Sequence, residues 1–205
     1  MKTKLSALLV TTVLLSSTAA LADNMMVRMR AINVMPDESG TPSAIGGDVK
    51  LNTATVPELD FSYFFSKNLA VELILATTTH NASAQKTSLN NLDLGHVSLL
   101  PPTLLAQYHL EFGKLKPYVG AGLNYTIFYG EEPGVARSVT YENNFGYALQ
   151  VGGDYQIGDN LFLNLDIKKI YLSTDVEVKT YANGTVKADV DIDPLIVGMG
   201  LGWKF

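Results

Sequence analysis

The feature that most constrains the fold of this chain is an alternation of apolar and polar residues that recurs along its length. In Leu195–Phe205 every odd position is apolar, and glycine or lysine occupies most of the even positions. A period of two is typical of a β-strand with one apolar face. Similar segments are Leu59–Tyr63, Leu69–Leu75, Leu104–Phe112, Val119–Tyr129, Tyr147–Tyr155 and Leu161–Ile167. Together with the opening segment Val27–Val34, they predict eight strands.

The connections between these segments alternate in length. Ser66–Asn68, Gly113–Lys116 and Gly158–Asn160 are short and rich in turn-forming residues, whereas the intervening connections are long. This order is typical of outer-membrane barrels, which have short periplasmic turns and longer extracellular loops. In the last long connection, Asn183-Gly184 is a strong hairpin signal, so the two flanking strands are expected to project beyond the membrane as a β-ribbon.

The first 22 residues resemble a secretory leader. Lys2 and Lys4 precede the apolar stretch Leu5–Leu15, and Ala20-Leu21-Ala22 fits the small-x-small cleavage pattern. We therefore expect residues 1–22 to be a cleaved signal peptide and residues 23–205 to form a single transmembrane β-barrel domain. The leader holds two of the 15 Lys and Arg residues and none of the 20 Asp and Glu residues, so the mature chain is acidic. An acidic chain without a basic patch argues against nucleic acid as a partner.

Export and an apolar content of 47% point to the membrane, yet no stretch after residue 22 contains 18 consecutive apolar residues. Only helices and closed β-barrels satisfy their backbone hydrogen bonds within lipid. The sequence therefore predicts an all-β fold, an eight-stranded antiparallel barrel in the outer membrane of a Gram-negative cell, with the bilayer as its partner.

Strand parity also predicts which side chains face the barrel interior. Toward the short-turn end the inward set is charged and is expected to form a plug: Arg28, Arg30, Glu72, His109, Glu111, Asp154, Asp166 and Lys168. Toward the long-connection end it is apolar and is expected to form a ligand pocket: Ile32, Val34, Ile74, Leu105, Phe128, Ile170 and Ile196. An eight-stranded barrel is wide enough only for packed side chains or one small ligand. The same apolar side chains could instead pack on one another and leave no cavity.

Pro101 and Pro102 precede the fourth predicted strand. Neither residue has a backbone N–H group to donate, so the wall is expected to be locally unpaired there. Such a gap is a candidate lateral gate into the bilayer, and a simple kink between loop and strand is the alternative.

Enzymatic and metal-dependent functions are not supported by the sequence. His109 and Glu111 share an inward parity, but no serine is placed to complete a nucleophilic arrangement. His80, His96 and Asp93 match no known spacing of metal ligands. We expect no catalytic residues, no metal and no cofactor.

Several segments are similar to the outer membrane protein W (OmpW) family. They are Leu100–Tyr108, Lys116–Thr126, Val71–Leu73, Val151–Tyr155 and Asp193-Pro194, and they agree in order and spacing, with departures mainly in the long loops. The resemblance implies an eight-stranded barrel with a narrow, largely hydrophobic channel for uptake of small apolar compounds.

The sequence thus predicts a channel for passive uptake of small hydrophobic molecules, with an apolar upper lumen and a lateral exit. The alternative is a structural or interaction barrel with a packed lumen, whose extracellular loops bind host or envelope partners. Trp203 and the terminal Phe205 resemble the signal that barrel-assembly machinery recognises, so this machinery is an expected partner during biogenesis.

Overall fold

The computed structural model describes residues 24–39, 48–87, 90–181 and 184–205. The expected leader and the Asn183 turn position therefore lie outside the described residues. Within the described ranges the chain forms 14 strands, and no helix there is long and apolar enough to cross a membrane.

Eight of these strands close into an antiparallel barrel. They are β1 (Met25–Met35), β3 (Ala54–Phe64), β4 (Leu69–Ala76), β7 (Thr103–His109), β8 (Leu115–Glu132), β10 (Asn144–Gln156), β11 (Leu161–Tyr171) and β14 (Leu195–Lys204). Each pairs with the next along the chain, and β14 pairs with β1 from Met26↔Lys204 to Met35↔Leu195, which closes the sheet. The predicted eight-stranded barrel is confirmed, although β7 ends at His109 rather than at Phe112.

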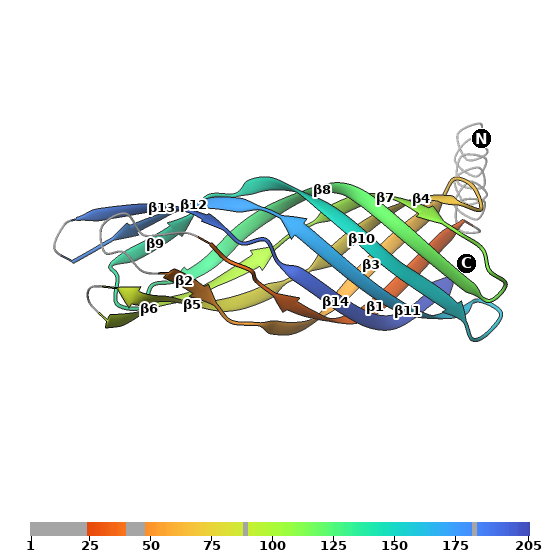
Figure 1. Cartoon of the computed structure of the whole chain (residues 1–205), viewed down its shortest axis with the longest axis horizontal. Helices are drawn as coiled ribbons and strands as arrows, with labels where there is room; N and C mark the ends of the chain where they lie inside the picture. The colour runs from red at the N-terminus through yellow and green to blue at the C-terminus, as the bar shows by residue number, and fades with distance from the viewer. Residues whose placement is uncertain (1–23, 40–47, 88–89, 182–183) are drawn as a thin grey trace, which may run out of the picture.

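The remaining six strands lie at one end of the barrel, opposite the end that holds the C terminus and the short turns (Figure 1). They are β2 (Asp48–Leu51), β5 (Thr78–Thr87), β6 (Asn90–Leu100), β9 (Ser138–Tyr141), β12 (Ser173–Lys179) and β13 (Thr185–Asp191). β2, β5 and β6 form a sheet, and β6 pairs with the part of β8 that lies away from the short turns. β9, β12 and β13 form a second sheet. We call these two sheets the extension. The long connections are therefore strands for much of their length, and the β12–β13 pair is the expected ribbon.

Alternation along the wall strands separates the two faces of the barrel. In β7 every second residue from Thr103 to His109 is buried and the residues between them are exposed. Leu104, Val119, Leu123, Leu149 and Leu165 are among the large apolar side chains on the outer face. Glycine permits close strand contact: a Cβ added at Gly122 would collide with the backbone carbonyl of Leu104.

Candidate functional site: a divided lumen

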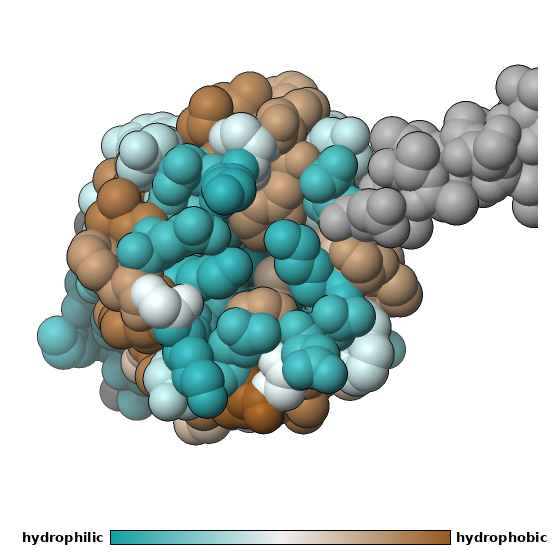
Figure 2. All heavy atoms as spheres, turned by 90° about the vertical axis from the view of Figure 1, so that its right-hand side faces the viewer, coloured by the Kyte–Doolittle hydropathy of each residue, from teal (hydrophilic) through white to brown (hydrophobic). Residues whose placement is uncertain are grey.

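The lower lumen, toward the short turns, is filled by a network of buried charges. Arg28 donates from Nε and Nη2 to both carboxylate oxygens of Asp154, at 3.0 and 2.7 Å, and from Nη1 to Glu72 at 3.1 Å. All three side chains are buried. At the surface of this end, hydrophilic side chains also lie at the centre of the barrel mouth, with apolar side chains around them (Figure 2). We call this network the plug.

Arg30 on β1 connects carboxylates of β3 with one of β11 across the lumen. Its guanidinium nitrogens lie 2.9 Å from Glu58, 2.7 Å from Asp60 and 3.2 Å from Asp166. Lys168 adds contacts of 2.6 Å to Glu58 Oε1 and 3.2 Å to Asp166 Oδ1. Because an unpaired buried charge is costly, this mutual pairing is what allows so many ionisable groups to share a narrow barrel.

The structure corrects one member of the expected plug. Glu111 is exposed at the rim, where it lies 3.4 Å from Lys116, because the chain leaves β7 at His109 and turns. His109 is buried, but its Nε2 contacts Gln107 Oε1 at 3.0 Å and not Glu111. The remaining predicted members, Arg28, Arg30, Glu72, Asp154, Asp166 and Lys168, are buried in the lower lumen.

The plug also contains seven residues that were not expected from the sequence: Glu58, Asp60, Ser62, Gln107, Tyr118, Gln150 and Asn164. Gln150 Nε2 donates to both Glu72 and Asp166 at 2.8 Å, and the Tyr118 hydroxyl donates to Asp166 at 2.8 Å. The alternation Leu59-Asp60-Phe61-Ser62 carried the signal for Asp60 and Ser62, because polar residues occupy the inward parity there.

Above the plug the lumen becomes apolar. The seven residues expected to form a pocket are all buried in one cluster, which also includes Val97, Leu99, Leu172 and Ile192. A cavity of about 50 Å³, which we call the lower cavity, lies within this cluster. Ile32, Val34, Ile74, Ile170 and Ile196 line it, and Glu58 and Lys168 of the plug lie at its boundary. Leu105 packs in the cluster but does not line the lower cavity.

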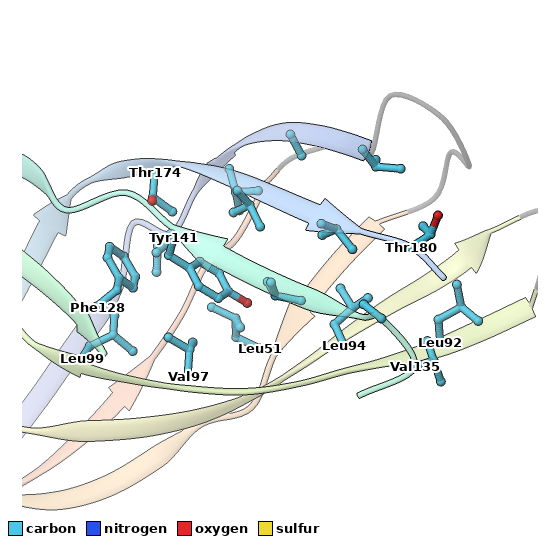
Figure 3. A pocket seen from close by; sticks show the side chains of 18 residues that line it. Leu51, Leu92, Leu94, Val97, Leu99, Phe128, Val135, Tyr141, Thr174 and Thr180 are labelled. Atoms are coloured by element: carbon cyan, nitrogen blue, oxygen red, sulfur yellow. The ribbon is translucent and has the colours of Figure 1, made fainter. Parts of the chain in front are cut away.

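A second cavity of about 140 Å³, the upper cavity, lies between the two sheets of the extension (Figure 3). Apolar residues of both sheets line it, among them Leu92, Leu94, Val97, Val139 and Val176. Phe128 and Tyr141 stack beside it with ring centroids 5.4 Å apart. Leu51, Leu99 and Ile192 line both cavities, so the two are direct neighbours along the lumen.

The comparisons with known proteins agree with this architecture. The family model described as the OmpW family matches residues 22–205. The chain belongs to the OmpW family. Among its relatives, an uncharacterised outer-membrane protein, y4mB, from Sinorhizobium fredii is 38% identical over 182 residues, which are 87% of this chain and 79% of that protein.

Two further proteins are similar to this OmpW-family chain, one in structure and one in sequence. The crystal structure of the outer membrane protein OprG from Pseudomonas aeruginosa superposes with a TM-score of 0.82 at 26% identity, covering 90% of this chain and 96% of that one. A Pseudomonas aeruginosa protein named "Dibenzothiophene metabolism operon protein PahQ" is 27% identical over 161 residues, covering 78% of this chain and 76% of that protein. The OmpW-family barrel is thus an outer-membrane protein, and the apolar outer face of its wall contacts the bilayer.

The wall of this OmpW-family barrel is interrupted at Pro101 and Pro102. The β4–β7 ladder ends at Ile74↔Thr103, and the β5–β6 ladder begins at Thr78↔Leu99 in the same register. Between them, residues 75–77 face residues 100–102 with no ladder pair, and the Thr77 hydroxyl is hydrogen bonded to the Tyr129 hydroxyl nearby. We call this interruption the seam. Pro101 lines the lower cavity, so the cavity reaches the seam.

A second proline interrupts the wall on another side, between β11–β12 and β13–β14. There the gap is bridged: Ile170 N–H donates to Pro194 O at 3.1 Å, and Ile192 N–H donates to Leu172 O at 2.9 Å. Leu172 N–H also donates to the Asp193 carboxylate at 2.8 Å. A proline alone therefore does not open the wall, and the seam differs because equivalent bridges are absent among its described residues.

The closing strand carries the expected assembly signal on its outer side. Trp203 is half exposed on β14 opposite Val27, and Phe205 is exposed while its N–H donates to Met25 O at 3.0 Å. Their role with the assembly machinery stays a prediction. Within the described ranges no group of three His, Cys, Asp or Glu side chains is arranged to hold a metal ion.

Proposed function

We propose that this OmpW-family protein mediates passive uptake of small hydrophobic molecules through the upper and lower cavities. The observation that carries the proposal is the pair of adjoining apolar cavities above a charged plug. An apolar cavity can remain empty of water and take up an apolar guest, and a cavity of about 150 Å³ is large enough for benzene. The name of the relative PahQ, which refers to the metabolism of an apolar polycyclic compound, supports the same class of substrate.

The plug sets the direction of exit in this proposal. An apolar molecule that reaches Glu58 and Lys168 meets ion-paired, hydrogen-bonded side chains, which it cannot displace without leaving charges unpaired. The seam lies beside the same cavity, and its backbone is already unpaired. We therefore propose that molecules leave sideways through the seam into the outer leaflet or core of the bilayer.

Blocking the upper cavity tests uptake. Val139 is buried and lines the upper cavity, whereas the next residue on β9, Thr140, is exposed on the other face. Val139→Arg is expected to reduce uptake of a small apolar tracer into proteoliposomes or cells at least about tenfold, because the charged side chain must lie in the passage. Thr140→Arg is the matched control and is expected to transport as the wild type does. Equal uptake by both variants would refute a route through the upper cavity.

Restoring backbone donors tests the lateral exit. A Pro101→Val/Pro102→Val double variant restores two N–H groups. Because successive N–H groups of a strand point to opposite sides, the one at position 101 faces Ala76 of β4 across the seam, and the one at position 102 faces β8, as the carbonyl of Pro102 does. Transport of the tracer is expected to slow several-fold while the barrel still assembles, as judged by its shift on heating before electrophoresis. Undiminished transport by a folded double variant would remove the seam from the proposed route and leave the cavities as a binding site.

A further inference from the structure

The lower cavity has a polar rim made of three buried threonines. Thr78 on β5, Thr103 on β7 and Thr126 on β8 line it together with His80. A threonine hydroxyl has one proton to donate and lone pairs with which to accept. The direction in which each proton is already used therefore decides what the rim can offer to a ligand.

Two of the three protons are donated to neighbouring protein groups. Thr103 Oγ1 donates to Pro101 O at 3.0 Å, and Thr126 Oγ1 donates to Asn124 Oδ1 at 2.8 Å. Asn124 Nδ2 in turn donates to Thr103 Oγ1 at 2.8 Å and to Pro101 O at 3.3 Å, which fixes the orientation of its amide. Both hydroxyls thus retain lone pairs and have no free proton.

The hydroxyl proton of the third threonine, Thr78, is donated to His80. Nδ1 of His80 lies 2.6 Å from Asn52 O, a group that can only accept, so Nδ1 carries the proton. Burial lowers the pKa of His80, which favours the neutral ring with an unprotonated Nε2. Nε2 lies 3.1 Å from Thr78 Oγ1 and accepts the proton of that hydroxyl. Thr78 therefore also offers only lone pairs.

The boundary with the plug supplies a stronger acceptor. Glu58 lines the lower cavity, and its Oε1 accepts from Arg30 Nε at 2.9 Å and from Lys168 Nζ at 2.6 Å. Its Oε2 has no hydrogen-bond partner in the described part of the chain. Lys168 directs a further contact of 3.2 Å to Asp166 Oδ1 in the plug. Lys168 also lines the cavity, and two of the three N–H donors of its ammonium are directed at Glu58 Oε1 and Asp166 Oδ1. With one ammonium N–H left against three threonine oxygens and Glu58 Oε2, the cavity presents acceptors in excess of donors.

Resting on the proposed uptake function, we propose that the lower cavity selects neutral apolar molecules that carry one O–H or N–H donor, such as phenols, alcohols and indoles. The donor of the ligand reaches Glu58 Oε2 or a threonine oxygen in the lower cavity, beside Ile32, Ile74 and Ile196. Since about 50 Å³ is less than the volume that holds benzene, the apolar part of the ligand extends into the adjoining upper cavity of about 140 Å³. Aldehydes and ketones offer only an acceptor and gain less. Ionised carboxylates are disfavoured because they bring a second negative charge to Glu58.

Three probes of similar size separate these cases: 4-ethylphenol, 4-ethylfluorobenzene and 4-ethylbenzaldehyde. Dissociation constants are measured by calorimetry on the purified full-length protein in detergent, and each variant is compared with the wild type for the same probe. This comparison cancels the partitioning of the probe into detergent. After each dissociation constant is corrected for the measured partitioning of its probe into the detergent, the wild type is expected to bind 4-ethylphenol about tenfold more tightly than the other two, a difference of about 1.4 kcal/mol.

Two variants test the assignment of the acceptors. Glu58→Gln replaces a carboxylate oxygen with an amide that can donate, so affinity for 4-ethylphenol is expected to fall about tenfold while affinity for 4-ethylbenzaldehyde rises. Thr126→Val removes one acceptor at nearly constant shape and is expected to lower phenol affinity about threefold, and it carries the test if Glu58→Gln does not fold. Thr140→Val, on the outer face of the extension, is the control and is expected to change nothing.

The outcomes distinguish the two proposals. Binding of all three probes without a preference for the phenol, or equal losses for phenol and fluorobenzene in the variants, would overturn donor selection and leave uptake of apolar molecules standing. Binding of none of the probes by the folded wild type would overturn the uptake proposal as well.

Discussion

The two halves of the lumen differ in chemistry although the same strands build both. On β1 the inward residues change from Arg28 and Arg30 to Ile32 and Val34, and on β11 they change from Lys168 to Ile170. The charged half is filled around Arg28 and Arg30 because each polar group requires a partner nearby, and a cavity of about 50 Å³ lies at its short-turn end, beside His109 and Lys204. The apolar half imposes no such requirement, so space between its side chains can remain empty. A change of residue type along one strand face therefore decides where the barrel is sealed and where it is hollow.

The largest expected effect comes from breaking the filled half. Arg30→Met removes the cation that pairs with Asp60, and one of the two cations, Arg30 and Lys168, that pair with Glu58 and Asp166 in a buried site. The barrel is therefore expected to lose about 3–5 kcal/mol of stability. Urea unfolding followed by the electrophoretic shift measures the loss. Lys86→Met is the control, because Lys86 and Asp48 form an exposed pair whose removal is expected to cost less than about 1 kcal/mol. Similar losses for the two variants would contradict the role assigned to the plug.

An intermediate effect is expected in the hollow half. Ile74 lines the lower cavity, whereas Leu105 is fully buried in the same cluster away from it. Ile74→Ala is expected to cost about 2 kcal/mol and Leu105→Ala about 4 kcal/mol, because a side chain beside an empty space has fewer packing partners to lose. The same unfolding assay compares them. If Ile74→Ala costs as much as Leu105→Ala, the lower cavity is closed by packing in the folded protein.

The smallest effect is expected at the seam. Thr77→Val removes the hydrogen bond between the Thr77 and Tyr129 hydroxyls, which lies where the ladder is interrupted. Thr79→Val removes a comparable bond to Ser98 of 2.8 Å, which lies over a paired ladder. Each is expected to cost about 1 kcal/mol or less. Only Thr77→Val is expected to speed release of an apolar tracer, by about twofold, and equal release rates in the two variants would argue against exit at the seam.

The sequence predicted the barrel because alternation and short turns are local features that can be recognised in each segment independently. The even number of segments then favoured closure into a barrel. It also predicted half of the buried residues of the plug and the seven apolar residues buried in the cluster above it, since parity assigns a residue to one face. Glu111 was misplaced because parity does not state where a strand ends, and β7 ends two residues before it.

The upper cavity escaped prediction for a different reason. In β6 the inward residues are Leu92 and Leu94 and then Val97 and Leu99, so their parity changes within one strand. The β5–β6 register shifts between Ala82 and Ser83, opposite Gly95, whose φ of 88° is accessible to glycine. A β-bulge of this kind inserts a residue and interrupts the alternation from which a strand is recognised.

The sequence by itself determined which face of each strand is polar or apolar, and thereby the closed barrel, its place in the outer membrane and the two chemical zones of its lumen. Only the tertiary structure decided which charges meet, that the extension encloses a second cavity, and that the wall is bridged at Pro194 but unpaired at Pro101 and Pro102. The physical reason is that residue type and parity are properties of one segment. Pairing, cavity volume and the direction of a hydroxyl proton depend on segments that are distant in the chain and meet only when the barrel closes.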